Sequence, residues 1–112
     1  MKRVIYKKVI NENKENRTEF LLINFDYEEG NDYLAKIFNK EFNMKVEEKK
    51  DCIWFSIIKL CKKKNTCYEL LWHEDIGNII YSLKQDEDTV NELELRLQKV
   101  LDVLNIKILE SN

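Results

Sequence analysis

The sequence predicts a single α+β domain spanning residues 1–112, with a mainly antiparallel sheet of five to seven strands and two helices. Three observations support this fold class. The chain has 112 residues, a usual size for one domain, and with no proline and only two glycines it contains nothing that resembles a flexible linker. Hydrophobic residues make up 44% of the chain, which is enough for one core. Turn residues separate several short β-rich segments, whereas only two segments have helical periodicity, too few for the repeated crossovers of a parallel sheet.

The expected order of elements is β-β-α-β-β-β-β-α, and its first part contains two strands and a helix. Residues 3–10 and 19–27 are predicted to form strands because β-branched and aromatic residues are concentrated there. The polar residues 11–17 between them predict a loop. A short helix is expected at residues 32–43, where apolar residues recur with helical spacing; these are Leu34, Ile37, Phe38 and Phe42.

Four further strands are expected in the middle of the chain. The predicted strands are residues 45–48, 52–61, 66–73 and 78–84. The first two are joined by a predicted turn at residues 49–51, and the next pair by a lysine-rich turn at residues 62–65. A third turn is expected at residues 75–77, because Gly77 supplies a residue that readily adopts the left-handed conformation.

The last helix is predicted from an apolar stripe that runs to about Asn105. Its expected N-cap is one of three residues, Asp86, Asp88 or Thr89. The sequence Thr89-x-x-Glu92 also matches a capping box. Residues 106–109 are expected to form a small edge strand after the helix.

A symmetric turn at residues 62–65 fixes the register of the central hairpin. Lys59 then lies opposite Glu69, and Ser56 lies opposite Trp72. Since successive side chains alternate between the two faces of a sheet, the core face is predicted to carry Trp54, Ile58, Leu60, Tyr68, Leu70 and Trp72. Trp72 is therefore expected to be mostly buried.

The other face of this hairpin is unusually apolar. It is predicted to carry Ile53, Phe55, Ile57, Leu71 and Tyr81, interrupted by Lys59, Glu69 and His73. Either a second element of the chain covers this face, or the face contributes to a protein–protein interface.

The three cysteines, Cys52, Cys61 and Cys67, are interpreted as reduced thiols of a cytoplasmic protein. Their number is odd and no pair has C-x-x-C spacing. The N-terminus lacks the apolar run of a secretory signal. His73 is expected roughly 20 Å from Cys61 and Cys67 at ~3.3 Å per strand residue, so no tetrahedral site combining them is predicted. No metal and no cofactor are expected.

The sequence does not favour catalysis or nucleic-acid binding. Gly30 and Gly77 are isolated, so a glycine-rich phosphate loop is absent from the sequence. The carboxylates are expected in turns rather than converging in a cleft, and the chain is interpreted as a protein that is not an enzyme. The isoelectric point is about 5.5, and the lysine runs are explained by solvated hairpin turns that discourage aggregation.

The charge along the chain favours a basic protein partner. Residues 1–64 carry 15 Lys and Arg and 11 Asp and Glu, for a net charge of +4, whereas residues 65–112 carry 4 and 10, for a net charge of −6. The acidic side chains expected to bind the partner are Glu74, Asp75, Asp86, Glu87, Asp88 and Glu92. Tyr81 is the expected contact from the neighbouring sheet.

Residues Tyr68–Asn78, followed by Ile79-Ile80-Tyr81-Ser82, carry a resemblance to a known class of protein. Together with the lysine- and asparagine-rich, glycine-poor composition, this segment resembles the small acidic α/β immunity proteins of bacterial toxin–immunity systems, including those of contact-dependent growth inhibition. The resemblance implies a non-catalytic cytosolic protein that binds and blocks a cognate toxin domain, commonly a nuclease. No individual binding residue can be assigned from this resemblance.

Two other functions remain open at this point. The chain could be a small accessory or regulatory domain that forms homo-oligomers through the apolar sheet face, or a weak nucleic-acid-binding domain. No membrane association is expected, because no segment approaches the roughly 20 apolar residues needed to span a bilayer.

Overall fold

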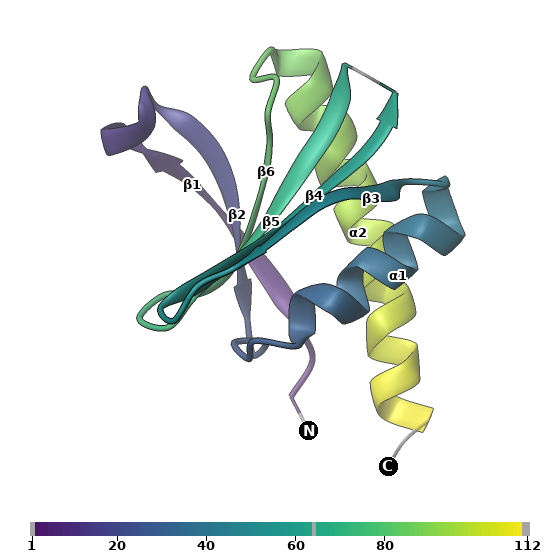
Figure 1. Cartoon of the computed structure of the whole chain (residues 1–112). Coiled ribbons are helices and arrows are strands. Elements are labelled where there is room, and N and C mark those ends of the chain that lie inside the picture. Colours follow the sequence, from purple (N-terminus) through teal and green to yellow (C-terminus); the bar gives the residue numbers. More distant parts are fainter. Residues whose placement is uncertain (1, 64, 111–112) are drawn as a thin grey trace.

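The computed structural model describes residues 2–63 and 65–110, and it confirms the α+β class and the predicted order of elements. Six strands of the described chain form one antiparallel sheet in the order β1-β2-β6-β5-β4-β3. Both helices lie on the same side of this sheet (Figure 1). The elements are β1 (Ile5–Asn11), the short 3-10 helix η1 (Glu12–Lys14), β2 (Arg17–Ile23), α1 (Gly30–Phe42), β3 (Lys45–Asp51), β4 (Phe55–Lys63), β5 (Thr66–His73), β6 (Gly77–Ser82) and α2 (Glu87–Glu110).

The hydrophobic core lies between the helices and the sheet. Apolar residues spaced by three or four positions put one face of each helix against the strands. The buried side chains that the sheet contributes are Phe20, Leu22, Ile58, Leu60, Tyr68, Leu70 and Ile80, and those of the helices include Leu34, Phe38, Leu93, Leu97, Val100 and Leu101. Each such side chain stabilises the fold by about 1.5–3 kcal/mol relative to its exposed state.

The register predicted for the central hairpin is confirmed. Lys59 pairs with Glu69, and Ser56 pairs with Trp72. The turn between β4 and β5 is shorter than the predicted residues 62–65, because β4 continues to Lys63 with a register shift after Cys61 and β5 begins at Thr66; Lys64 lies outside the described residues. Trp72 lies on the helix-facing side and is mostly, although not fully, buried, as predicted. Its indole Nε1 donates a hydrogen bond to the carbonyl oxygen of Asp26 over 3.4 Å.

The turn between β3 and β4 differs from the prediction, and this changes the environment of Trp54. Strand β3 continues to Asp51, so the turn consists of residues 52–54 rather than 49–51. The alternation of faces does not extend into a turn. Trp54 is therefore 62% exposed, and its prediction as a core residue is wrong.

Two other element ends also differ from the prediction. Strand β2 ends at Ile23, because Asn24 adopts a left-handed conformation with φ 68° and turns the chain. Helix α2 continues to Glu110, so the edge strand predicted at residues 106–109 is wrong. No proline or glycine stops the helix there, and Ile108 packs against the core from its last turns.

The expectation of three reduced thiols is also wrong for the structure, which joins Cys61 and Cys67 by a disulfide. Cys67 and Cys61 are direct partners across β4 and β5. The carbonyl oxygen of Cys67 accepts a hydrogen bond from the Leu83 amide, on the side away from β4. The pair is therefore a non-hydrogen-bonded one, the type in which cross-strand Cα atoms are closest, and here they are 4.2 Å apart. Cys52 is the free cysteine.

A search of the described helices for a membrane-crossing segment finds none that is sufficiently long and apolar.

Candidate functional site: the hairpin tips

The sheet has one face without helices, which we call the open face. The sequence left two explanations for its apolar character, and within residues 2–63 and 65–110 no second element covers it (Figure 1). All six residues of β6, in the middle of the sheet, are nevertheless buried. Side chains of the neighbouring strands therefore shield the centre of the open face.

A polar network contributes to this shielding around Tyr81. The guanidinium carbon of Arg17 lies 3.6 Å from the centre of the Tyr81 ring, and Arg17 also forms an ion pair of 2.6 Å with Glu19. The Tyr81 hydroxyl donates a 2.5 Å hydrogen bond to the carboxylate of Glu69. Burial raises the pKa of Tyr81 well above its ordinary value, and the bond to Glu69 raises it further. Tyr81 is 4% exposed and fully engaged, so it is not placed to contact a partner.

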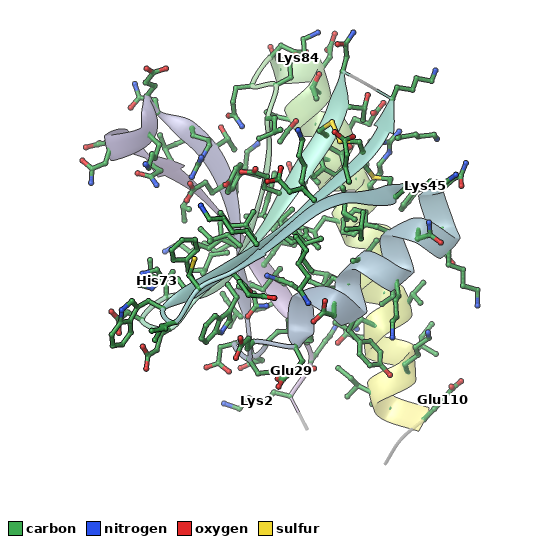
Figure 2. The ribbon with its side chains drawn as sticks, viewed as in Figure 1. Lys2, Glu29, Lys45, His73, Lys84 and Glu110 are labelled. Carbon is green, nitrogen blue, oxygen red and sulfur yellow. A yellow bond between two sulfur atoms is a disulfide. The ribbon has the colours of Figure 1, made fainter. Side chains whose placement is uncertain are left out.

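Three of the exposed apolar residues lie at the tips of two adjacent hairpins. Ile53 and Trp54, in the turn between β3 and β4, are 85% and 62% exposed, and Ile76, between β5 and β6, is 55% exposed. The amide of Glu74 donates a 3.0 Å hydrogen bond to the carbonyl oxygen of Trp54, which joins the two turns. We call Ile53, Trp54, Glu74, Asp75 and Ile76 the hairpin-tip patch; His73, the residue before Glu74, is labelled in Figure 2.

The turn between β5 and β6 is rigidly built. The Asp75 amide donates a 3.1 Å hydrogen bond to Nδ1 of His73, and the Ile76 amide donates one to the His73 carbonyl oxygen. Gly77 has φ +100°, a conformation that strongly favours glycine. A Cβ atom at Gly77 would also lie 3.2 Å from Cβ of Asp26, so glycine allows the loop between β2 and α1 to approach the turn closely.

Carboxylates occur in the turns of the patch, at the end of β3 and in the loop between β2 and α1. Three of these residues are Glu74 and Asp75 of the patch and Asp51 at the end of β3. The other three, Asp26, Glu28 and Glu29, belong to the loop between β2 and α1. All six residues are exposed, and among the described residues none of them forms an ion pair. This end of the molecule therefore combines exposed apolar anchors with carboxylates that form no ion pair among the described residues, although Asp51 and Glu28 act electrostatically on Lys49.

The structure separates the acidic residues that the sequence grouped together. Glu74 and Asp75 belong to the hairpin-tip patch, whereas Asp86, Glu87 and Asp88 lie at the other end of β6, where α2 begins. A six-residue strand spans roughly 20 Å at ~3.3 Å per residue. Figure 2 shows the two ends through the positions of His73 and Lys84. Glu92 lies further along α2 and forms an ion pair with Arg96 over 3.0 Å.

Sequence reasoning missed Trp54 and Ile76 as contact residues, whereas it put Ile53 on the face that it left open as an interface. The polar sequence Lys49-Lys50-Asp51 is typical of a turn, so the turn was predicted there and not at residues 52–54. An isoleucine and a tryptophan beside a strand are more often core residues, so the composition gave no signal of their exposure. Ile76 lies in a turn that was correctly predicted, and this position alone could have identified it.

Comparisons with family models, with curated proteins and with solved structures find no match for this chain.

Proposed function

We propose that this protein is a non-catalytic binding module of the cytoplasm, and that it neutralises a cognate bacterial toxin domain as an immunity protein. The observation that carries the proposal is the hairpin-tip patch, in which Trp54 and Ile53 stand exposed among carboxylates without ion pairs. Isolated apolar residues are common on surfaces, but here three occupy two turns held together by a hydrogen bond.

The patch has the two components of a tight interface. A tryptophan that enters a pocket of the partner typically contributes 2 kcal/mol or more, and few other residue types do so as often. The nearby carboxylates attract a positively charged surface and accelerate its association. Because the turns are already ordered by the bonds of His73 and Glu74, little conformational entropy is lost when they bind.

A basic toxin domain fits this chemistry. A toxin that cleaves nucleic acid has to hold a phosphate backbone, and it does so with lysine and arginine side chains. The carboxylates at the hairpin tips can pair with such side chains and exclude the nucleic acid. The segment that resembles immunity proteins, Tyr68–Asn78, includes most of β5 and the turn that carries Glu74, Asp75 and Ile76, so the resemblance overlaps the patch.

The proposal is tested with the toxin domain that an immunity function predicts to be encoded directly upstream of this gene. Co-expression of the wild-type chain should protect cells from that domain, and the two proteins should form a one-to-one complex. Trp54→Ala should weaken the complex by about 2 kcal/mol or more, a loss of at least roughly 30-fold in affinity. The unfolding free energy should change little, because Trp54 is an exposed turn residue.

Leu95→Ala provides the matched control. Leu95 is 66% exposed, comparable to Trp54, but it lies on α2 rather than in a hairpin tip. It should leave affinity and protection unchanged. If Trp54→Ala binds as tightly as the wild type, the patch is not the interface. If no neighbouring toxin exists and the chain instead forms a dimer that Trp54→Ala dissociates, the patch binds a second copy and the immunity function is rejected.

A further inference from the structure

A second group of reactive side chains lies at the opposite end of the open face from the hairpin-tip patch. Cys61 in β4, Cys67 in β5 and Glu47 in β3 each offer one ligand atom, and the three atoms lie within 4.8 Å of one another. The three strands are neighbours in the sheet (Figure 1). The two cysteines are largely buried, with exposed fractions of 8% and 7%.

The pairing of the strands explains why these residues meet. Cys61 and Cys67 are direct cross-strand partners, and Lys45 of β3 lies opposite Cys61 on its other side. Because successive side chains of a strand point to opposite faces, Glu47 lies on the same face of β3 as Lys45. A β-bulge between Val46 and Glu48 makes Glu47 the extra residue of this pairing, so that it reaches toward Lys59 and the cysteines.

We propose that the reduced form of the protein binds a divalent cation of the zinc class through Cys61, Cys67 and Glu47. Thiolates and a carboxylate are established ligands of Zn²⁺, and three protein ligands with water in the fourth position make a complete tetrahedral set. Sequence reasoning excluded a metal site that combines His73 with the cysteines, and His73 lies at the other end of β5 from Cys67. It did not consider Glu47 as a ligand.

The geometry suits such an ion once the disulfide is open. With Zn–S bonds of ~2.3 Å, two thiolates of a tetrahedral site are roughly 3.8 Å apart. The Cα atoms of the two cysteines are 4.2 Å apart, and rotation about their Cα–Cβ bonds brings the sulfurs to that separation without movement of the strands. The Glu47 side chain is 58% exposed, so it can turn toward the ion from the rim.

The disulfide makes the site dependent on redox conditions. Two thiol molecules reduce the Cys61–Cys67 bond: two electrons and two protons pass to the cysteine sulfurs, and the reductant sulfurs join in a disulfide of their own. The cation then binds two thiolates and releases the two protons. The oxidised protein has no thiolate to offer at this position and should not bind the ion.

Lys59 provides a second, independent control of the site. Its ammonium nitrogen lies 3.7 Å from the Glu47 carboxylate and competes with the cation for that ligand. Lys59→Met keeps a side chain of similar length and removes the charge, so it should strengthen cation binding. Glu47→Gln should weaken binding about tenfold or more, since even changes to residues that only orient metal ligands cost about 10–100-fold in affinity.

The test is a Co²⁺ titration of protein reduced with a phosphine, followed by competition with Zn²⁺. One Co²⁺ per chain should bind with the charge-transfer absorption of cobalt–thiolate bonds. Cys61→Ser and Cys67→Ser should lose this absorption, while Cys52→Ser, which removes the free cysteine outside the site, should retain it. The oxidised wild type should not show the absorption, and it serves as a folded control if a serine variant does not fold.

Several results would overturn the proposal. These are a reduced protein without thiolate absorption, an unchanged affinity in Cys61→Ser, or a loss of binding in Cys52→Ser. An unchanged affinity in Glu47→Gln would remove Glu47 from the site. None of these measurements involves the toxin partner, so the outcome is independent of the proposed immunity function.

Discussion

At the scale of single residues, Tyr81 is the centre of a buried polar network that joins β2, β5 and β6 through Arg17 and Glu69. The alternation of faces correctly put Tyr81 on the side of the sheet away from the helices. Its burial could not be predicted, because it depends on Arg17, which is distant in sequence and reaches the ring only after β2 has paired with β6. A residue expected to contact a partner is therefore part of an internal network with Glu69.

This network predicts a specific loss of stability at alkaline pH. The pKa of Tyr81 is raised in the folded state by burial and by Glu69, while in the unfolded chain it is about 10. Above pH 10 the unfolded state releases this proton and the folded state retains it, so the unfolding free energy falls by roughly 1.4 kcal/mol per pH unit. The contribution is fully present below pH 10 and is lost as the pH rises toward the folded pKa.

Urea unfolding between pH 9 and pH 11.5 measures this effect. Tyr81→Phe should lower the slope of stability against pH, although at pH 7 it costs about 1 kcal/mol through the lost hydrogen bond. Equal slopes in Tyr81→Phe and the wild type would mean that the Tyr81 hydroxyl is not buried in a hydrogen bond with Glu69.

At the scale of elements, pairing was predicted better than element ends. The register of β4 and β5 agrees with the one predicted from the local turn between them, although the Lys59 ammonium, opposite Glu69, forms its ion pair with Glu47. The ends of β3 and α2 depend on tertiary contacts: β3 is an exposed, charged edge strand that only its pairing with β4 extends to Asp51. Local propensity carries no information about such pairing.

The start of α1 is likewise set by a contact that the sequence did not indicate. A Cβ atom at Gly30 would lie 2.6 Å from Cε2 of Phe25, whose ring is fully buried. Gly30→Ala should therefore destabilise the fold by about 1–3 kcal/mol, the usual cost of overpacking. Alanine favours helices by only ~1 kcal/mol, too little to offset this.

Thermal and urea unfolding of Gly30→Ala check this prediction. Lys36→Ala, at an exposed position of α1, is the control and should change stability by less than about 0.5 kcal/mol. A stabilised Gly30→Ala would show that Phe25 can move away at no cost and that helix propensity decides at this position.

At the scale of the whole molecule, the sequence predicted a charge asymmetry but not its distribution in space. The excess of acidic residues in the second half of the chain is divided between the two ends of β6. At the hairpin end, acidic residues of the first half join those of the second, since the loop between β2 and α1 lies beside the turn of Glu74 and Asp75. The partner-facing charge is therefore assembled by the fold from distant segments.

Two double charge reversals distinguish the ends of the molecule. Glu74→Lys with Asp75→Lys, and Glu87→Lys with Asp88→Lys, each change the formal net charge from −2 to +2. At 0.1 M salt the screening length is about 10 Å, and the two ends are roughly 20 Å apart, so each reversal acts mainly on its own end. Reversal at the hairpin tips should slow association with a basic toxin domain and flatten its dependence on salt.

Reversal at the start of α2 should affect association much less, although both variants have the same net charge. Stopped-flow association rates at low and high salt measure this difference, because steering charges act on the association rate more than on dissociation. Equal slowing by both variants would mean that only net charge matters. A larger effect of the Glu87 and Asp88 reversal would place the interface at the end where α2 begins, and the anchoring role assigned to Trp54 would have to be abandoned.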